Sequence, residues 1–159
     1  FAALRYFNAA GYDINNRLSF LEKNPANLIP VTMEVAYGLR PKMFVYGNDY
    51  DTPDGTGLRD YIHVSDLAIA HVKALDFLQH NNTLKVNLST GEKHSVIDVI
   101  KMTTKVSGKK INYEIVERRA GDPAALYANS NLAYDKLNWK PKYSNLRKLI
   151  ESTWDAYNK

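Results

Sequence analysis

The 159-residue chain contains no cysteine, which excludes disulfide bonds, zinc–thiolate sites and thiol catalysis together. No apolar run approaches the roughly 20 residues of a membrane-spanning helix, so no membrane partner is expected. With 45% hydrophobic and 11% aromatic residues, the composition is that of a folded domain and not of a disordered chain.

Catalytic motifs are also missing. The 8 glycines form neither a G-x-G-x-x-G dinucleotide loop nor a P-loop. None of the 11 tyrosines has a lysine four positions later, which excludes a helical Tyr–Lys pair in which the lysine activates a phenol. No two histidines are four positions apart, so no metal site is expected, and His63 and His71 are interpreted as packed or surface imidazoles. The sequence therefore predicts no catalytic residue in this chain.

The charge is mild and dispersed. The chain has 21 Lys and Arg against 17 Asp and Glu, a net charge of +4. Its densest basic pair, Arg118 and Arg119, stands next to Glu117 and close to Asp122. Proteins that bind nucleic acids usually concentrate basic residues on one face, so no nucleic-acid partner is expected.

The first seven residues are apolar apart from Arg5, which predicts a strand buried on both faces of a parallel sheet. Such a strand needs partners on both sides, and no turn or cap precedes it. We therefore expect this chain to be the later part of a longer protein, with unpaired sheet edges and exposed apolar side chains at strands 1–7 and 85–88.

Helices and strands alternate along the rest of the chain, which places it in the α/β or α+β class. A helix is predicted over residues 28–37, because Gly38 and Pro41 end it, and a second helix is expected to be capped by Ser65. The apolar stripe of this second helix is expected to include Leu67, Val72 and Leu75. The other predicted elements are strands over 42–46, 59–64 and 111–116, an extended segment at 126–128, and helices after a Ser95–Asp98 capping box, over 131–137 and over 146–157.

Three charged residues suggest recognition of a small polyanion. Arginine presents a planar fork of donors to phosphate oxygens, and a carboxylate accepts hydrogen bonds from the vicinal hydroxyls of a ribose. Arg59, Arg119 and Asp122 are thus the set that a nucleoside diphosphate needs, although on spacing alone adjacent arginines such as Arg118 and Arg119 are more often a solvated surface pair.

Six short strings resemble one known family. LRYFN at residues 4–8 and NLIP at 27–30 are similar to the extended short-chain dehydrogenases/reductases. Four further strings narrow the match: YGNDY at 46–50, DGTGLRDYIHV at 54–64, RRAGDP at 118–123 and NWKP at 138–141. Together they resemble the C-terminal part of the UDP-glucose 4-epimerase family, over essentially all of the chain.

This resemblance implies an α/β fold, the C-terminal substrate-binding part of an extended Rossmann-type dehydrogenase/reductase. Residues 1–159 would form a UDP-sugar-binding part, with 1–11 and about 84–107 in the Rossmann sheet layer and the NAD-binding N-terminal domain absent. The family interconverts UDP-glucose and UDP-galactose through a 4-keto sugar with bound NAD, in galactose metabolism. The resemblance also implies a cytoplasmic isomerase that is a homodimer through its N-terminal domain. Alone, this chain is expected to be inactive.

The resemblance further implies roles for individual residues. Phe7 and Tyr6 match positions beside the nicotinamide of NAD, and Asn8 matches the asparagine that bonds the sugar. Asn27 and Leu28, where a helix begins, match residues near the UDP-sugar.

The nucleotide positions lie further along the chain. By the same resemblance, the uracil pocket is lined by Phe44, Val45 and Tyr46. Arg59 and Arg119 match the arginines that bind the pyrophosphate, and Asp122 matches the carboxylate on the ribose. Tyr61 lies near the nucleotide by resemblance, although core packing explains a tyrosine there equally well. Leu126 occupies a position linked to tolerance of N-acetylated sugars and leaves that preference open.

Two alternative functions of the chain remain open. The chain could belong to another nucleotide-sugar epimerase or dehydratase, such as a UDP-N-acetylglucosamine 4-epimerase. It could also be a non-catalytic nucleotide-binding module, a reading that the missing Tyr–Lys pair favours.

Overall fold

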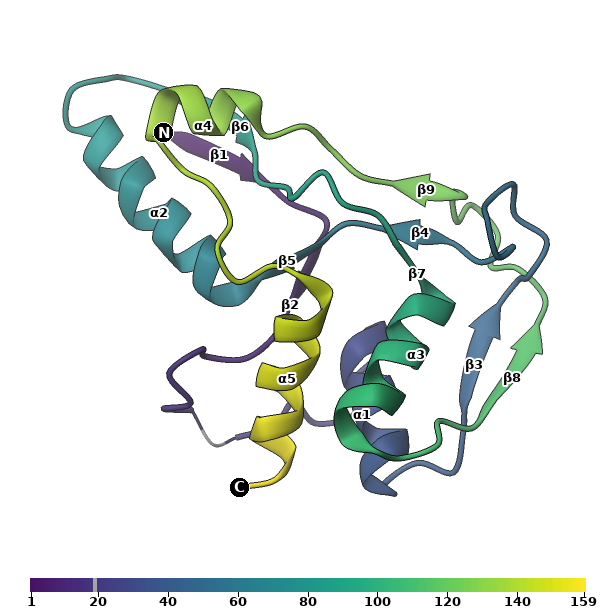
Figure 1. Cartoon of the computed structure of the whole chain (residues 1–159). Helices are drawn as coiled ribbons and strands as arrows, with labels where there is room; N and C mark the ends of the chain where they lie inside the picture. Colours follow the sequence, from purple (N-terminus) through teal and green to yellow (C-terminus); the bar gives the residue numbers. More distant parts are fainter. Residues whose placement is uncertain (19) are drawn as a thin grey trace.

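The structure is a computed structural model, and it describes residues 1–18 and 20–159. Helices and strands are mixed, as the sequence predicts (Figure 1). In chain order they are β1 Ala2–Arg5, β2 Asn8–Ala10, α1 Leu28–Tyr37, β3 Met43–Tyr46, β4 Leu58–Arg59, β5 Tyr61–His63, α2 Val64–Leu78, β6 Leu84–Asn87, β7 His94–Ser95, α3 Val96–Ser107, β8 Tyr113–Val116, β9 Ala125–Leu126, α4 Asn131–Leu137 and α5 Leu146–Tyr157.

One end of the molecule is built on strands β1 and β6. They pair in parallel, from Ala2 beside Leu84 to Arg5 beside Asn87, and α2 and α4 pack against them (Figure 1). The core between these elements is apolar and includes Ile62, Leu67, Val86 and Trp139. Because apolar burial is the main favourable contribution to folding, this cluster holds α2 and α4 on the two strands.

Among residues 1–18 and 20–159, the sheet of β1 and β6 has two strands, so each of them has an unpaired edge. Apolar side chains at and beyond β1 are exposed: Phe1 is 67% and Phe7 44% accessible. These observations confirm the expected unpaired edges and exposed apolar side chains at β1. At residues 85–88 the expectation of exposed apolar side chains is wrong, because Val86 and Leu88 are buried in the core under α2 and α4.

Helices α1, α3 and α5 pack on one another at the other end of the molecule (Figure 1). Their shared core includes Met33, Val99, Leu149 and Ile150. Residues 84–107 are thus divided between two regions: β6 pairs with β1, whereas α3 packs against α1 and α5.

The helix boundaries follow from their caps. Helix α1 spans the predicted residues and ends at Gly38, whose φ of 87° is left-handed and therefore suits glycine. Helix α3 starts with the predicted capping box, in which the Ser95 hydroxyl accepts from the Asp98 N–H at 2.9 Å and the Asp98 carboxylate accepts from the Ser95 N–H at 3.0 Å.

Helix α2 differs from the prediction in two ways. Its N-cap is His63 and not Ser65, because the His63 imidazole Nδ1 accepts the Ser65 N–H at 3.0 Å. Its packed face is centred on Ala70 and Ala74, and Val72 and Leu75 are exposed. Small alanines let α2 approach the strands closely. Leu67 of the predicted stripe is buried with them, whereas Val72 and Leu75 point away from the core.

The predicted strand over 59–64 is two strands separated by Asp60. Strand β4 pairs with β7 and β9, and β5 pairs in parallel with β2. The buried Asp60 carboxylate accepts from Ser89 Oγ at 2.7 Å and from the Gly91 N–H at 3.0 Å, which anchors the chain where it changes sheets. Arg59 and Tyr61 on either side of it therefore have a fixed backbone.

Strand β3 pairs in parallel with β8, from Met43 beside Tyr113 to Tyr46 beside Val116. The two strands consequently end side by side, and their following loops, which carry Tyr50 and Arg119, leave the sheet at the same edge.

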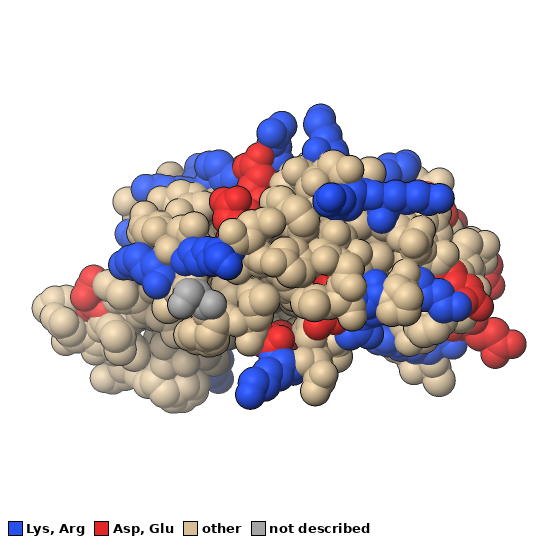
Figure 2. Space-filling model, turned by 90° about the horizontal axis from the view of Figure 1, so that it is seen from below, with Lys and Arg blue, Asp and Glu red and all other residues tan. Residues whose placement is uncertain are grey.

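On the face drawn in Figure 2, Lys and Arg side chains are scattered, with Asp and Glu among them. Among the helices that the structure describes, none has the length and apolar character needed to cross a bilayer.

Candidate functional site

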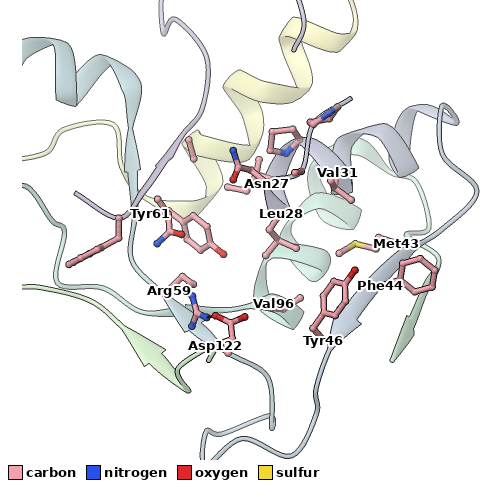
Figure 3. Close-up of a pocket in the computed structure, with 18 of the residues that line it drawn as sticks. Asn27, Leu28, Val31, Met43, Phe44, Tyr46, Arg59, Tyr61, Val96 and Asp122 are labelled. Carbon is pink, nitrogen blue, oxygen red and sulfur yellow. Dashed lines mark hydrogen bonds and ion pairs between the residues drawn. The ribbon is translucent and has the colours of Figure 1, made fainter. Parts of the chain in front are cut away.

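A cavity of about 680 Å³ lies where four parts of the chain meet: the end of β1 with β2, the start of α1, strand β3 with its following loop, and the β4 and 119–122 segments (Figure 3). Its size is that of a typical small-molecule site. Among the residues that line it are the predicted site residues Tyr6, Phe7, Asn8, Asn27, Leu28, Phe44, Tyr46, Arg59, Tyr61, Arg119 and Asp122.

Two predicted site residues lie outside this cavity. Val45 is 1% exposed and belongs to the core beneath β3, because alternate residues of a strand face opposite sides. Leu126 is in β9, where it pairs with Arg59 of β4. Neither residue lines the cavity wall.

Arg59 and Asp122 lie on one side of the cavity, across from Asn27 and Leu28 (Figure 3). The Arg59 Nη2 atom is 2.5 Å from Asp122 Oδ1, and Nη1 donates to the backbone carbonyls of Leu58 and Pro123 at 2.9 and 3.0 Å. The Arg59 side chain is only 15% exposed. The guanidinium is thus held in one orientation, with its positive charge shared with a carboxylate that itself lines the cavity.

Arg119 reaches the cavity from the loop after β8. Its guanidinium carbon lies 3.7 Å from the centre of the Tyr46 ring, a cation–π arrangement. Arg59 from β4 and the pair Arg119 and Asp122 from the loop after β8 therefore line one cavity. This donor set suits a phosphate-bearing ligand with hydroxyl groups.

The start of α1 adds backbone donors. Asn27 is extended, and the N–H groups of the first helical residues, Leu28 and Ile29, have no acceptor within a helix. The helix dipole gives this end a partial positive charge, so an anion in the cavity is stabilised from this side as well.

The polar wall near β2 and β5 is formed by Asn8 and Tyr61, which pair across the two strands. The Asn8 Nδ2 atom donates to the Asp60 carbonyl at 2.9 Å, which fixes the direction of the amide. Burial raises the pKa of the Tyr61 phenol far above its ordinary value, against the opposing effect of Arg59. The Tyr61 phenol is therefore a neutral hydroxyl group at physiological pH.

Most of the chain matches one known protein family. The family model described as GDP-mannose 4,6 dehydratase matches residues 2–153. The chain belongs to this family. The relatives that match it include the UDP-glucose 4-epimerase of Drosophila melanogaster, 47% identical over 96% of this chain and 44% of its own length.

Solved structures in the family superimpose on nearly the whole chain. A UDP-glucose 4-epimerase from Bifidobacterium longum in complex with NAD+ and UDP has a TM-score of 0.92 and 42% identity, over 99% of this chain and 47% of that one. One from Stenotrophomonas maltophila, with bound NAD and formylated UDP-arabinopyranose, has a TM-score of 0.93 and 42% identity, over 99% and 47%. The match is to the C-terminal part of these structures. The chain thus spans about half the length of the relatives it matches.

The cavity of this family member has wall residues that the sequence did not single out. They include Arg40, Met43, Tyr50, Gly57 and Val96. Tyr50 is in the YGNDY string, so the motif could have suggested it. Met43 precedes Phe44, the first predicted pocket residue of the strand, and Val96 follows the α3 cap, so only the tertiary arrangement brings them to the site.

His63, interpreted from the sequence as a packed or surface imidazole, is packed. His63 is fully buried, and its Nε2 lies 3.0 Å from Ser152 Oγ. Burial lowers its pKa, although Asp66 and Asp13 oppose this shift. His63 is therefore neutral at pH 7 and does not line the cavity.

Proposed function

We propose that this chain is the UDP-sugar-binding part of a UDP-glucose 4-epimerase, an isomerase of galactose metabolism. The observation that supports this most is the convergence of Arg59, Arg119 and Asp122 in one cavity. The names of the relatives point to the same nucleotide-sugar chemistry.

In this proposal the diphosphate lies between the two arginines and the start of α1, where guanidinium and backbone N–H groups supply donors. The ribose hydroxyls are bonded by Asp122, and the uracil packs beside Phe44 and Tyr46. The sugar then extends toward Asn8. The Arg59–Asp122 pair has to open in part, because both groups gain ligand contacts.

For NAD, this chain offers the aromatic side chains of Tyr6 and Phe7, 40% and 44% exposed at the cavity, and no glycine-rich loop for the phosphates. Flat apolar rings fit the nicotinamide, so these residues would form one wall of the cofactor site. When bound, NAD supplies the hydride acceptor for C4 of the sugar. The sequence contains no Tyr-x-x-x-Lys to act as base, so this chain alone should not epimerise a UDP-sugar.

The first prediction tests the nucleotide site by calorimetric titration of the 159-residue chain with UDP and with uridine. UDP should bind at least about tenfold more tightly than uridine, since each charge-assisted phosphate contact contributes about 1.5–3 kcal/mol. Arg119→Ala should remove most of this difference and leave uridine affinity nearly unchanged. Equal affinities for UDP and uridine in the folded wild-type chain would contradict the proposal.

A non-catalytic nucleotide-binding module would pass that titration too. A chain as long as the relatives, containing this sequence, should interconvert UDP-glucose and UDP-galactose; turnover of UDP-N-acetylglucosamine instead would favour the other epimerase.

A further inference from the structure

Two consecutive arginines stack on two nearby tyrosines, Tyr46 at the end of β3 and Tyr50 in the loop after it. Arg119 lies over the Tyr46 ring, at 3.7 Å, and Arg118 lies over the Tyr50 ring, at 4.1 Å. Arg119 lines the cavity, whereas Arg118 does not. The two stacks lie on either side of Gly47, where the loops after β3 and β8 meet.

Gly47 allows this close approach. Its φ is 85°, and a Cβ atom there would lie 2.6 Å from Arg118 Cγ and 2.9 Å from Tyr50 Cε2. Its backbone N–H donates to the Val116 carbonyl at 2.8 Å, which extends the pairing of β3 with β8 into the loops. The absent side chain leaves the space that the Arg118 side chain occupies.

Arg118 is held by a further residue of the same loop. Its Nε donates to Asp49 Oδ1 at 2.6 Å, and its Nη2 donates to the Asp49 backbone carbonyl. An exposed ion pair of this kind contributes little stability by itself. Its geometric effect is larger, because two hydrogen bonds and a stack together fix the position and direction of one guanidinium.

We propose that Asp49, Tyr50 and Arg118 position Arg119 for the diphosphate. This inference rests on the proposed function. Arg118 adjoins Arg119 in the chain, so fixing its side chain fixes the backbone from which Arg119 projects. The same backbone is tied to Asp122, whose N–H donates to the Arg119 carbonyl at 3.2 Å. A guanidinium ordered before the ligand arrives loses less conformational entropy on binding, and this difference raises affinity.

The test measures UDP and uridine affinities of Arg118→Ala and Arg118→Lys by calorimetry. Both should weaken UDP binding by about three- to tenfold, the scale of one stacked and hydrogen-bonded arginine, and leave uridine affinity unchanged. Lysine keeps the positive charge but has no planar fork, so wild-type UDP affinity in Arg118→Lys would mean that the charge alone acts, and would overturn the proposal.

The coupling between the two arginines gives a second readout. In an Arg119→Ala background, Arg118→Ala should cause no further loss of UDP affinity, because Arg118 acts through Arg119. Additive losses would overturn the proposal. The matched control is Arg147→Ala, which removes another exposed, ion-paired arginine on α5 away from the cavity and should not change UDP affinity.

Two variants of Tyr50 distinguish the role of its ring from the role of its hydroxyl group. Its hydroxyl is buried without a hydrogen-bond partner among the described residues, so the ring carries the contact with Arg118. Tyr50→Leu should reproduce the Arg118→Ala loss, and Tyr50→Phe should retain most of the affinity. An equal loss of UDP and uridine binding in Tyr50→Phe would show that the hydroxyl binds the ligand directly, and would overturn the positioning role.

If the wild-type chain does not bind UDP, the proposed function itself fails, and this outcome is distinct from a failure of the positioning role.

Discussion

At the scale of single residues, about half of the cavity wall consists of residues that the sequence singled out. Arg59, Arg119 and Asp122 were expected to act together, and all three line one cavity. Residue types and motifs made this possible, because the ligand chemistry of arginine and aspartate is independent of the fold. Residue types and motifs did not predict where each side chain points. Val45 lies between two cavity residues of β3 and faces the core, and Asp122 pairs with Arg59.

The buried imidazole of His63 leads to a prediction at this scale. Burial lowers the pKa of His63, so the unfolded chain, with an ordinary imidazole pKa of about 6.5, binds the proton more readily. The free energy of unfolding should therefore fall as pH drops through about 6.5, with the His63 contribution present above that pH. Urea unfolding at a series of pH values checks this.

The controls for that measurement are two glutamine variants. His63→Gln should be less stable than wild type at pH 7 and should show a smaller fall between neutral and acidic pH. Exposed His80→Gln should keep the wild-type pH dependence. An unchanged slope in His63→Gln would refute the assignment.

At the scale of elements, helix boundaries were predicted well where local signals are strong. Helices α1, α4 and α5 span the expected residues, because apolar spacing and end residues define them. The start of α2 was wrong, since a histidine side chain replaces the usual serine cap. Its packed face was predicted only in part: Leu67 is buried as expected, but close packing favours Ala70 and Ala74 over the larger Val72 and Leu75.

The capping box of α3 gives a stability prediction. Ser95→Ala removes the acceptor for the Asp98 N–H and a hydroxyl contact with the Asp54 carboxylate. The free energy of unfolding should fall by about 1–2 kcal/mol, measured by urea denaturation. Ser107→Ala is the matched control in the last turn of the same helix, where the hydroxyl donates to the Thr103 carbonyl, and it should change stability by less than about 0.5 kcal/mol. Equal effects of the two variants would contradict the role of the cap.

At the scale of the whole molecule, local sequence signals could not give the pairing of strands. β1 pairs with β6 and β3 with β8 across long stretches of chain, and the predicted strand over 59–64 is shared between two sheets. These arrangements depend on contacts between distant segments, whereas propensity reports only on neighbours. The cavity exists because such segments meet, so its residues could be predicted from motif resemblance but not from spacing.

The most direct measurement of the central claim is a crystal structure of this chain grown with UDP. The account predicts phosphate oxygens within hydrogen-bonding distance of Arg59 and Arg119, with Asp122 bonded to the ribose. A nucleotide bound elsewhere on the chain, or one in this cavity whose phosphates touch neither arginine, would contradict it.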